Sequence, residues 1–278
     1  MNRHRYDGAT FIYDPDTMSV LSNYINNSIG IQNVNVNEEY CNKYRAWIES
    51  TRNNTVTGLD CFPCADYSHG TTESFDKFYA RHPKRTIKVY EGEYSYHTYA
   101  TDVKRVEKSP IGPNDAVIIS LPFASSGGDH RYKETMERCT QLGVPVLVDC
   151  CWFGTVSGLT FDFNYPCIED VVFSLSKTFP VSKLRIGIRF SKLYYDGMSA
   201  YTDHNYINSF NQNIGIQYLD NFSPDYIYEK YHDAQLVTCD NLGVTPSNSV
   251  SLALGGKEWE HLKRGPYNRL CIVDELAR

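Results

Sequence analysis

The chain of 278 residues lacks the marks of several large protein classes. No apolar run approaches the ~20 residues that a membrane helix needs, and residues 1–6 lack the apolar core of a signal peptide. The net charge is −6, and no basic cluster is long enough to follow a nucleic-acid backbone. Internal repeats and low-complexity tracts are also missing. These absences favour a cytoplasmic globular protein with small-molecule substrates and no membrane or nucleic-acid partner.

Nine cysteines, an odd count without a secretory signal, indicate reduced and mostly buried thiols. Cys61 and Cys64 form a lone CxxC, and the residues after Pro63 read as a loop. Zinc would need two more ligands, and nothing places His69 or His82 beside this pair. We therefore expect structural cysteines and assign no metal ligand.

The most informative segment is Ser174-Leu175-Ser176-Lys177, which follows the apolar run 171–173 and precedes Arg185. The run is short, β-branched and aromatic, which predicts a buried strand. Burial lowers the pKa of a lysine, and a lysine with a free amine condenses with aldehydes to form Schiff bases. The nearby hydroxyls and guanidinium suit a phosphate. An aldehyde with a phosphate describes pyridoxal 5'-phosphate, whereas the plain alternative is a surface lysine just past a strand.

This segment resembles that of the aspartate aminotransferase superfamily, the fold-type I enzymes that use pyridoxal phosphate. In that family, a Ser-x-Ser-Lys segment carries the cofactor, and an arginine eight residues later holds its phosphate. The resemblance implies that Lys177 is the Schiff-base lysine and that Ser174, Ser176 and Arg185 bind the phosphate.

Residues 144–149 read as an apolar strand that ends in Asp149, after a helix-like segment over 131–142. Ligands of open α/β sheets bind at the carboxyl ends of the strands. A carboxylate there can pair with a protonated pyridine nitrogen and keep the cofactor ring an electron sink, and the family has an aspartate in this place. The alternative is a helix-capping or turn aspartate.

Residues 67–74 lead into a predicted amphipathic helix. They look like the family's Gly-Thr/Ser-Thr-Glu turn, which places Gly70, Thr71 and Thr72 on the cofactor phosphate. A helix N-terminus favours an anion, because its amides lack partners and the helix dipole is positive there. Without the family, the segment is only a capping box.

The loop after the predicted strand 85–90 carries, in the family, an aromatic ring that stacks on the pyridine. Tyr94 is our choice by position, with Tyr96 or His97 as alternatives. A tyrosine that serves packing fits the pattern equally well.

Two positions depart from the family. Alignment of residues 121–128 with Pro-x-Asn-Pro-Thr-Gly puts Ala124 where an asparagine donates to the ring oxygen of the cofactor, and alanine cannot donate. Trp152 stands where many members have a tyrosine. The ring oxygen is therefore less well supported than usual, unless Ser125, Ser126 or Trp152 compensates.

Near the C-terminus, residues 246–256 alternate polar and apolar side chains, and residues 267–273 follow as a second strand. They resemble the small-domain strands of the family, in which an arginine clamps the α-carboxylate of the substrate. We assign this role to Arg269, since a guanidinium matches a carboxylate with two parallel hydrogen bonds. A plain edge-strand arginine is the alternative.

The resemblance spans about residues 67–272 and implies an α/β fold. We expect a three-layer α/β/α large domain with a mainly parallel sheet over residues 60–220. A reduced small α+β domain would be built from the chain ends, residues 1–59 and 221–278. The asparagine-rich stretch 23–37 reads as loop and short elements that could cover the site or reach a partner subunit.

The first functional hypothesis is an aminotransferase that acts on amino acid and keto acid substrates, as a homodimer. Lys177 would also move the proton to and from Cα of the substrate. The same parts serve lyases, decarboxylases and racemases. The second hypothesis, supported by Ala124 and Trp152, is a catalytically impaired, cofactor-binding member that keeps the fold for binding or assembly.

Overall fold

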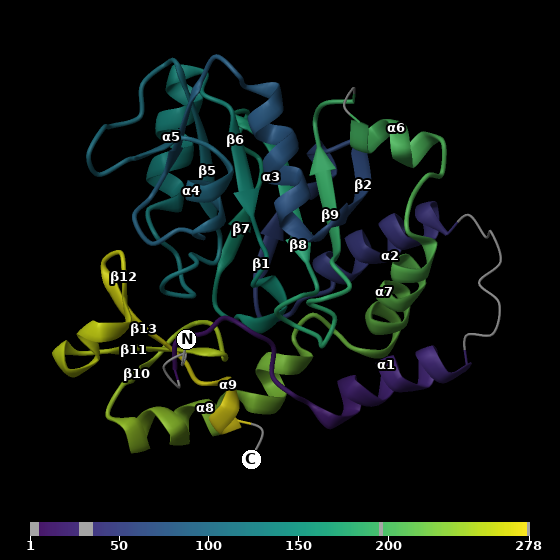
Figure 1. The fold of residues 1–278 in the computed structure, drawn as a ribbon, viewed down its shortest axis with the longest axis vertical. Coiled ribbons are helices and arrows are strands. Elements are labelled where there is room, and N and C mark those ends of the chain that lie inside the picture. The colour runs from purple at the N-terminus through teal and green to yellow at the C-terminus, as the bar shows by residue number, and fades with distance from the viewer. Residues whose placement is uncertain (1–5, 28–35, 195–196, 277–278) are drawn as a thin grey trace.

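The computed structural model of the protein describes residues 6–27, 36–194 and 197–276. Its centre is a seven-stranded sheet of order β2-β9-β8-β6-β5-β3-β4 (Figure 1). These strands are β2 (Cys64–His69), β3 (Thr86–Val89), β4 (Val103–Arg105), β5 (Asp115–Ser120), β6 (Val146–Asp149), β8 (Ile168–Ser174) and β9 (Ile186–Ser191).

The central sheet is mainly parallel, as predicted. Strands β8, β6, β5, β3 and β4 run in the same direction, and β9 is antiparallel to both of its neighbours. Every residue of β5, β6 and β9 is buried, which is typical of strands covered on both faces. Ser120 at the end of β5 pairs in register with Asp149 at the end of β6. The carboxyl ends of the parallel strands therefore bring polar side chains to one edge.

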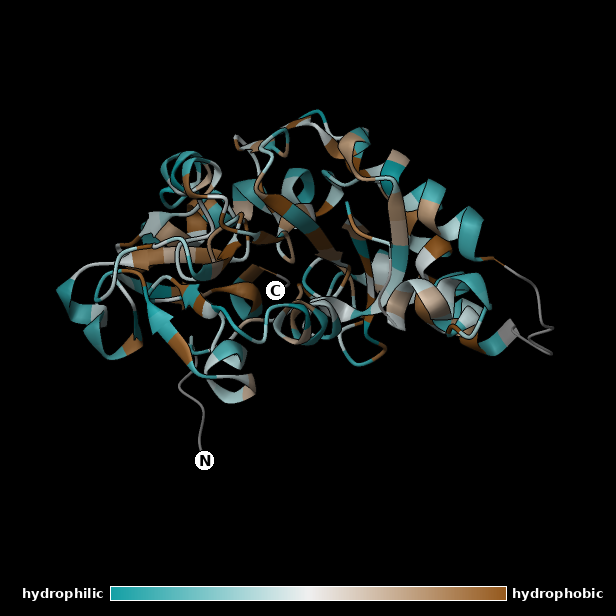
Figure 2. Ribbon diagram, turned by 90° about the horizontal axis from the view of Figure 1, so that it is seen from above, coloured by the Kyte–Doolittle hydropathy of each residue, from teal (hydrophilic) through white to brown (hydrophobic). Residues whose placement is uncertain are grey.

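Helices cover both faces of this sheet, which makes the fold a three-layer α/β/α sandwich. Along β5, Ala116 and Ile118 pack with Phe75 and Phe78 of α3 (Gly70–Arg81). The alternate residues of β5 belong to the larger core, which includes side chains of α2 (Asn37–Glu49), α5 (Tyr132–Leu142) and α7 (Ser209–Asn221). Figure 2 shows the apolar strands at the centre and hydrophilic residues on the outer helices.

A second, four-stranded antiparallel sheet of order β10-β11-β13-β12 lies beside the large sandwich (Figure 1). Its strands are β10 (Thr245–Pro246), β11 (Leu252–Gly255), β12 (Lys263–Arg264) and β13 (Tyr267–Cys271). Helices α8 (Tyr226–Leu242) and α9 (Val273–Leu276) precede and follow these strands in the chain. The N-terminal segment joins it, because the carbonyl of Tyr6 accepts a hydrogen bond of 2.9 Å from the amide of Cys271. A small α+β unit is therefore present; its four strands come from the C-terminal end of the chain, and the N-terminal segment contributes this backbone contact.

The domain boundaries at residues 60 and 220 stay a prediction. Helix α2 contacts α7 and β2, and the hydroxyl of Tyr40 donates to the carbonyl of Gly187 in β9 at 2.8 Å. The N-terminal part of the chain thus reaches the large sandwich as well as the small sheet.

The remaining elements are α1 (Pro15–Asn27), α4 (Tyr96–Ala100), α6 (Gly197–Asp203) and a parallel pair of short strands, β1 (Thr55–Thr57) and β7 (Thr160–Asp162). Two expectations need correction. Residues after Pro63 form the edge strand β2 and not a loop, because six of them pair with β9. Residues 23–27 of the asparagine-rich stretch belong to α1, whereas residues 28–35 lie outside the described part of the chain.

None of the helices within residues 6–27, 36–194 and 197–276 is both long enough and apolar enough to cross a membrane.

Candidate active site

One cavity of about 770 Å³, including its mouth, lies at the carboxyl edge of the central sheet and beside the small sheet. Ten of the eleven predicted site residues line it: Thr71, Thr72, Tyr94, Asp149, Trp152, Ser174, Ser176, Lys177, Arg185 and Arg269. The eleventh, Gly70, is not a lining residue but lies against the side chain of Arg185, which is one. Segments that are far apart in the sequence therefore converge on one site.

The N-terminus of α3 and Arg185 form a cradle for an anion. The Nη2 atom of Arg185 donates to Oγ1 of Thr72 at 3.1 Å. Gly70 has φ +68, and a Cβ added there would lie 2.3 Å from Nη2 of Arg185. Only glycine leaves room for the guanidinium against the first turn of the helix. Oε2 of Glu73 accepts from the amide of His69 at 2.8 Å, but His69 is the N-cap residue and its side chain makes no capping hydrogen bond, so only the glutamate half of the predicted capping box is formed.

Arg185 is held in an unusual backbone conformation, with φ +61. Its carbonyl accepts hydrogen bonds from the amide of Gly70 at 3.1 Å and from the hydroxyl of Tyr67 at 3.0 Å. These bonds join the start of β9 to β2 and α3. They offset the cost of the left-handed conformation, which is uncommon for a residue with a side chain.

Two buried serines lie directly before the lysine. The hydroxyl of Ser174 is 2.8 Å from that of Ser176 and donates to the carbonyl of Ile186 at 3.1 Å. The Nζ atom of Lys177 donates to the carbonyl of Ala9 at 2.6 Å and lies 5.4 Å from the centre of the Trp152 ring. The lysine thus points into the cavity and not to the surface.

Asp149 shares the buried end of the sheet with a second carboxyl group, that of Glu93, which sequence reasoning missed. Burial, and after it the charge of Glu93, raises the pKa of Asp149 to about 7. Burial also raises the pKa of Glu93 to about 7, against the hydrogen bonds from Ser120 that lower it. Both the amide, at 2.7 Å, and the hydroxyl of Ser120 donate to Glu93. Two buried like charges repel, so this pair holds a proton near neutral pH.

Of the three aromatic candidates on the loop after β3, Tyr94 lines the cavity and is 47% exposed. Tyr96 donates to Asp76 outside the cavity lining, at 2.9 Å. His97 is fully buried and pairs with the hydroxyl of Tyr79 at 2.7 Å, and burial lowers its pKa to about 3. Of the three, Tyr94 is therefore the ring that lies in the cavity wall, and its stacking on a cofactor stays a prediction.

The two departures from the family lie in the cavity wall. Ala124 has no side-chain donor, and its carbonyl accepts from Nη1 of Arg269 at 2.8 Å. Trp152 is 5% exposed and faces Lys177. Ser125 and Ser126, considered as substitutes for the missing asparagine, do not line the cavity. The hydroxyl of Ser125 is buried and finds no hydrogen-bond partner within the described residues.

Two arginines of the small sheet reach the same cavity. Arg269 is 3% exposed, and burial together with the charge of Arg264 lowers its pKa to about 10. Its Nη2 atom donates to the carbonyl of Gly8, and its Nε atom is buried without a partner among the described residues. Arg264 was missed from the sequence; its Nη2 atom lies 2.7 Å from Oδ1 of Asp7.

Comparison with known proteins finds matches to the fold of this chain but not to its sequence. No protein-family model and no curated protein matches the chain by sequence. Solved structures do match: a pyridoxal phosphate-bound C-S lyase from Staphylococcus hominis has a TM-score of 0.70 at 12% identity, over 97% of this chain and 86% of that one. An aromatic aminotransferase from Pyrococcus horikoshii has a TM-score of 0.69 at 12% identity, over 98% and 91%.

A probable N-succinyldiaminopimelate aminotransferase from Thermus thermophilus has a TM-score of 0.67 at 13% identity, over 98% of this chain and 91% of that one. The chain has the fold of the aspartate aminotransferase superfamily. At such low identity the likeness establishes this aminotransferase fold alone, and the activity has to be argued from the side chains of the site.

Proposed function

We propose that the chain is a pyridoxal phosphate-dependent enzyme and, within that class, an aminotransferase that acts on an amino acid or a related amine. The observation that carries the proposal is the position of Lys177. Its amine lies in one cavity with the anion cradle of Thr72 and Arg185 and with the buried carboxyl groups of Asp149 and Glu93. An amine, an anion cradle and a carboxyl group match the aldehyde, the phosphate and the ring nitrogen of this cofactor.

The residues present fit the cofactor. The phosphate would be held by the guanidinium of Arg185, by side-chain hydroxyls and by the first turn of α3, where Gly70 leaves the space clear. The hydroxyl donors are Thr71, Thr72, Ser174 and Ser176. Tyr94 would stack on the ring, and Trp152 would flank it. Of the three residues considered as substitutes for the donor that Ala124 removes, Trp152 is the one that lines the cavity.

Pyridoxal phosphate, when bound, supplies an aldehyde that condenses with the substrate amine and a ring that withdraws electrons from Cα of the substrate. Lys177 would hold the cofactor and then take the proton from Cα with its free Nζ. Asp149 would keep a proton on the ring nitrogen, because a carboxylate beside that nitrogen favours its charged form. Each of these residues acts from the carboxyl edge of the sheet, where ligands of such sheets bind.

Arg269 would orient the substrate through its α-carboxylate. Its guanidinium is held by the carbonyls of Ala124 and Gly8, and its Nε atom has no described partner. A substrate carboxylate would satisfy that buried donor. The choice between transamination and other reactions at Cα depends on how the substrate lies, so the products must decide it.

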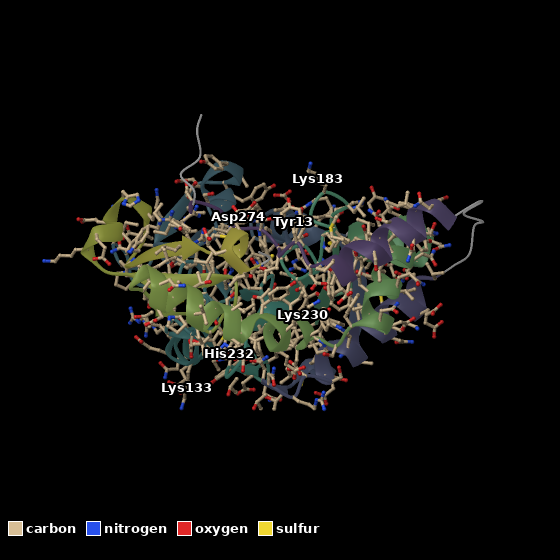
Figure 3. The ribbon with its side chains drawn as sticks, turned by 90° about the horizontal axis from the view of Figure 1, so that it is seen from below. Tyr13, Lys133, Lys183, Lys230, His232 and Asp274 are labelled. Atoms are coloured by element: carbon tan, nitrogen blue, oxygen red, sulfur yellow. The ribbon has the colours of Figure 1, made fainter. Side chains whose placement is uncertain are left out.

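The test is amino-group transfer by protein reconstituted with pyridoxal phosphate. A panel of amino acids is incubated with a 2-oxo acid, and the new amino acid is measured by chromatography. We expect transfer by the wild type and by the control variant Lys183→Ala. Lys183 is exposed (Figure 3) and lies in the same loop between β8 and β9 as Lys177. Lys177→Ala should lower the rate by on the order of 10²–10⁴-fold.

Two other outcomes are informative. Release of ammonia, carbon dioxide or a thiol without transfer would replace the aminotransferase by a lyase or decarboxylase of the same fold. A wild-type protein that takes up no pyridoxal phosphate would contradict the whole proposal.

A further inference from the structure

Arg264 has no part in the function proposed above, yet it lines the same cavity as Arg269. Its charge is one of the causes that lower the pKa of Arg269, after burial. The two guanidinium groups thus present two positive charges to one cavity. A single α-carboxylate satisfies one guanidinium, so the second cation is available for a different anionic group.

The position of Arg264 is set by the turn that follows it. Gly265 has φ +57, and a Cβ added there would lie 2.2 Å from the carbonyl oxygen of Glu91. The carbonyl of Arg264 would be 3.2 Å from a Cβ added at Gly92. This hairpin turn thus packs closely against the loop that carries Tyr94, and it holds the arginine at the rim of the cavity.

The chain supplies its own anion to Arg264. Oδ1 of Asp7 lies 2.7 Å from Nη2 of Arg264, and the two side chains are 47% and 40% exposed. Backbone contacts on both sides of the aspartate fix its place: the carbonyl of Tyr6 accepts from the amide of Cys271 at 2.9 Å, and that of Gly8 accepts from Arg269. The carboxylate of Asp7 therefore pairs with Arg264 when no substrate is bound.

We propose that Arg264 forms a second anion subsite and that Asp7 is a specificity-determining residue, because its carboxylate occupies that subsite. The inference rests on the function proposed above. A substrate with one carboxylate binds Arg269 and leaves the pair of Asp7 and Arg264 intact. A substrate with a second anionic group, carboxylate or phosphate, must first displace Asp7. Asp7 thus selects against such substrates by competition.

The test measures binding to the protein reconstituted with pyridoxal phosphate, by calorimetry. The probes are propionate with one carboxylate, succinate with two, and 3-phosphonopropionate, whose second group is a phosphonate. Asp7→Asn should raise the affinity for succinate about threefold to fivefold, as expected for release of an exposed ion pair, and leave that for propionate unchanged. The phosphonate arm shows which anion the subsite prefers.

Two further variants make the result specific. In Arg264→Gln, the preference for succinate over propionate should fall, and Asp7→Asn added to it should give no further gain. Glu134→Gln is the matched control: it removes one negative charge from an exposed ion pair, that with Arg131, away from the cavity. It should leave both affinities unchanged.

The inference is overturned if Asp7→Asn leaves the preference for succinate over propionate unchanged, or if Glu134→Gln gives the same gain. Cofactor uptake, measured by visible absorption, distinguishes a failure of the proposed function from a failure of the proposed subsite. Uptake with an unaltered preference in Asp7→Asn would overturn the inference alone. A wild type without uptake would overturn the proposed function and the inference together.

Discussion

Glu93 and Asp149 determine the electrostatics at the buried end of the site. Both carboxyl groups are almost fully buried, and burial raises the pKa of each to about 7. A bound ring with a protonated nitrogen would favour the ionised form of Asp149, and the charge on Asp149 would then favour the protonated form of Glu93. Glu93 is thus suited to take up the proton that Asp149 releases.

This pair predicts how stability depends on pH in the cofactor-free protein. The folded state raises the pKa of Glu93 from 4.5, so it binds a proton more tightly than the unfolded chain does. The contribution of protonated Glu93 to the free energy of unfolding is therefore fully present below about pH 4.5 and is lost as pH rises towards 7. Glu93→Gln cannot ionise, and its amide oxygen can still accept from Ser120. Between pH 5 and pH 8 the variant should lose roughly 2–3 kcal/mol less of its free energy of unfolding than the wild type.

Urea unfolding at the two pH values measures this difference. Glu137→Gln, a change at an exposed carboxyl group, is the control and should follow the wild type. Equal losses in wild type and Glu93→Gln would mean that Glu93 does not hold the proton.

Gly70 gives a second prediction at the scale of one residue. Gly70→Ala places a methyl group against Arg185 and also strains a backbone at φ +68. We expect cofactor affinity to fall by about tenfold or more, since one displaced charge-assisted hydrogen bond is worth that much. Gly243→Ala has the same kind of backbone, at φ +65, with nothing within 4 Å of the added Cβ. It should cost about 1 kcal/mol of stability and leave cofactor affinity unchanged. Similar affinity losses in both variants would refute the role of the cleared space.

At the scale of elements, local pattern predicted those that carry the cofactor residues. Strands β8, β6 and β5 and helix α3 follow from short apolar runs, a turn glycine and a capping box, all of which can be read within about ten residues. Other parts could not be read in this way. Strand β2 is defined by its pairing with β9, and Glu93 and Arg264 reach the cavity only through packing between segments distant in the sequence. No local pattern marks residues 7–9 as part of a site.

Helix α1 depends on a charge network at its start. The same network holds Asp14, where the N-terminal segment that contains residues 7–9 ends. Asp14 is fully buried and accepts from the amide of Thr17 at 2.8 Å and from the hydroxyl of Tyr231 at 2.7 Å. Lys230 of α8 (Figure 3) pairs with Asp14 and, at 2.8 Å, with Asp16. Burial opposes ionisation of Asp14, but these hydrogen bonds and the charge of Lys230 keep its pKa lowered.

Asp14→Ala should therefore lower the free energy of unfolding by roughly 2–4 kcal/mol, because it removes a helix cap and leaves a lysine without its buried partner. Asp16→Ala, with a side chain 67% exposed, should cost much less than Asp14→Ala, because solvent screens an exposed ion pair. Urea denaturation at pH 7 compares the two. Equal costs would show that α1 does not depend on the buried carboxylate.

For the whole molecule, the aminotransferase fold is formed within 278 residues, and all four strands of the small sheet lie in the C-terminal part of the chain. The sequence predicted this architecture because the residues of the site occur in the family's order. It could not predict the reaction, since Ala124 and Trp152 alter the wall beside the cofactor and their effect depends on the position of the substrate.

We expect the protein to be a homodimer. Tyr94, the ring proposed to stack on the cofactor, is 47% exposed, and Tyr99 on the adjacent helix α4 is 84% exposed. A second subunit would cover these aromatic rings and exclude water from the site. Light scattering coupled to size exclusion should give twice the mass of one chain. A monomer that retains full transferase activity would refute this prediction.

Borohydride reduction of the reconstituted protein, followed by proteolysis and mass spectrometry, shows whether Lys177 carries pyridoxal phosphate. We expect one pyridoxyl group, on the peptide that contains Lys177, and its loss in Lys177→Ala but not in Lys183→Ala. A pyridoxyl group on another lysine, or no group at all, would mean that Lys177 does not hold the cofactor.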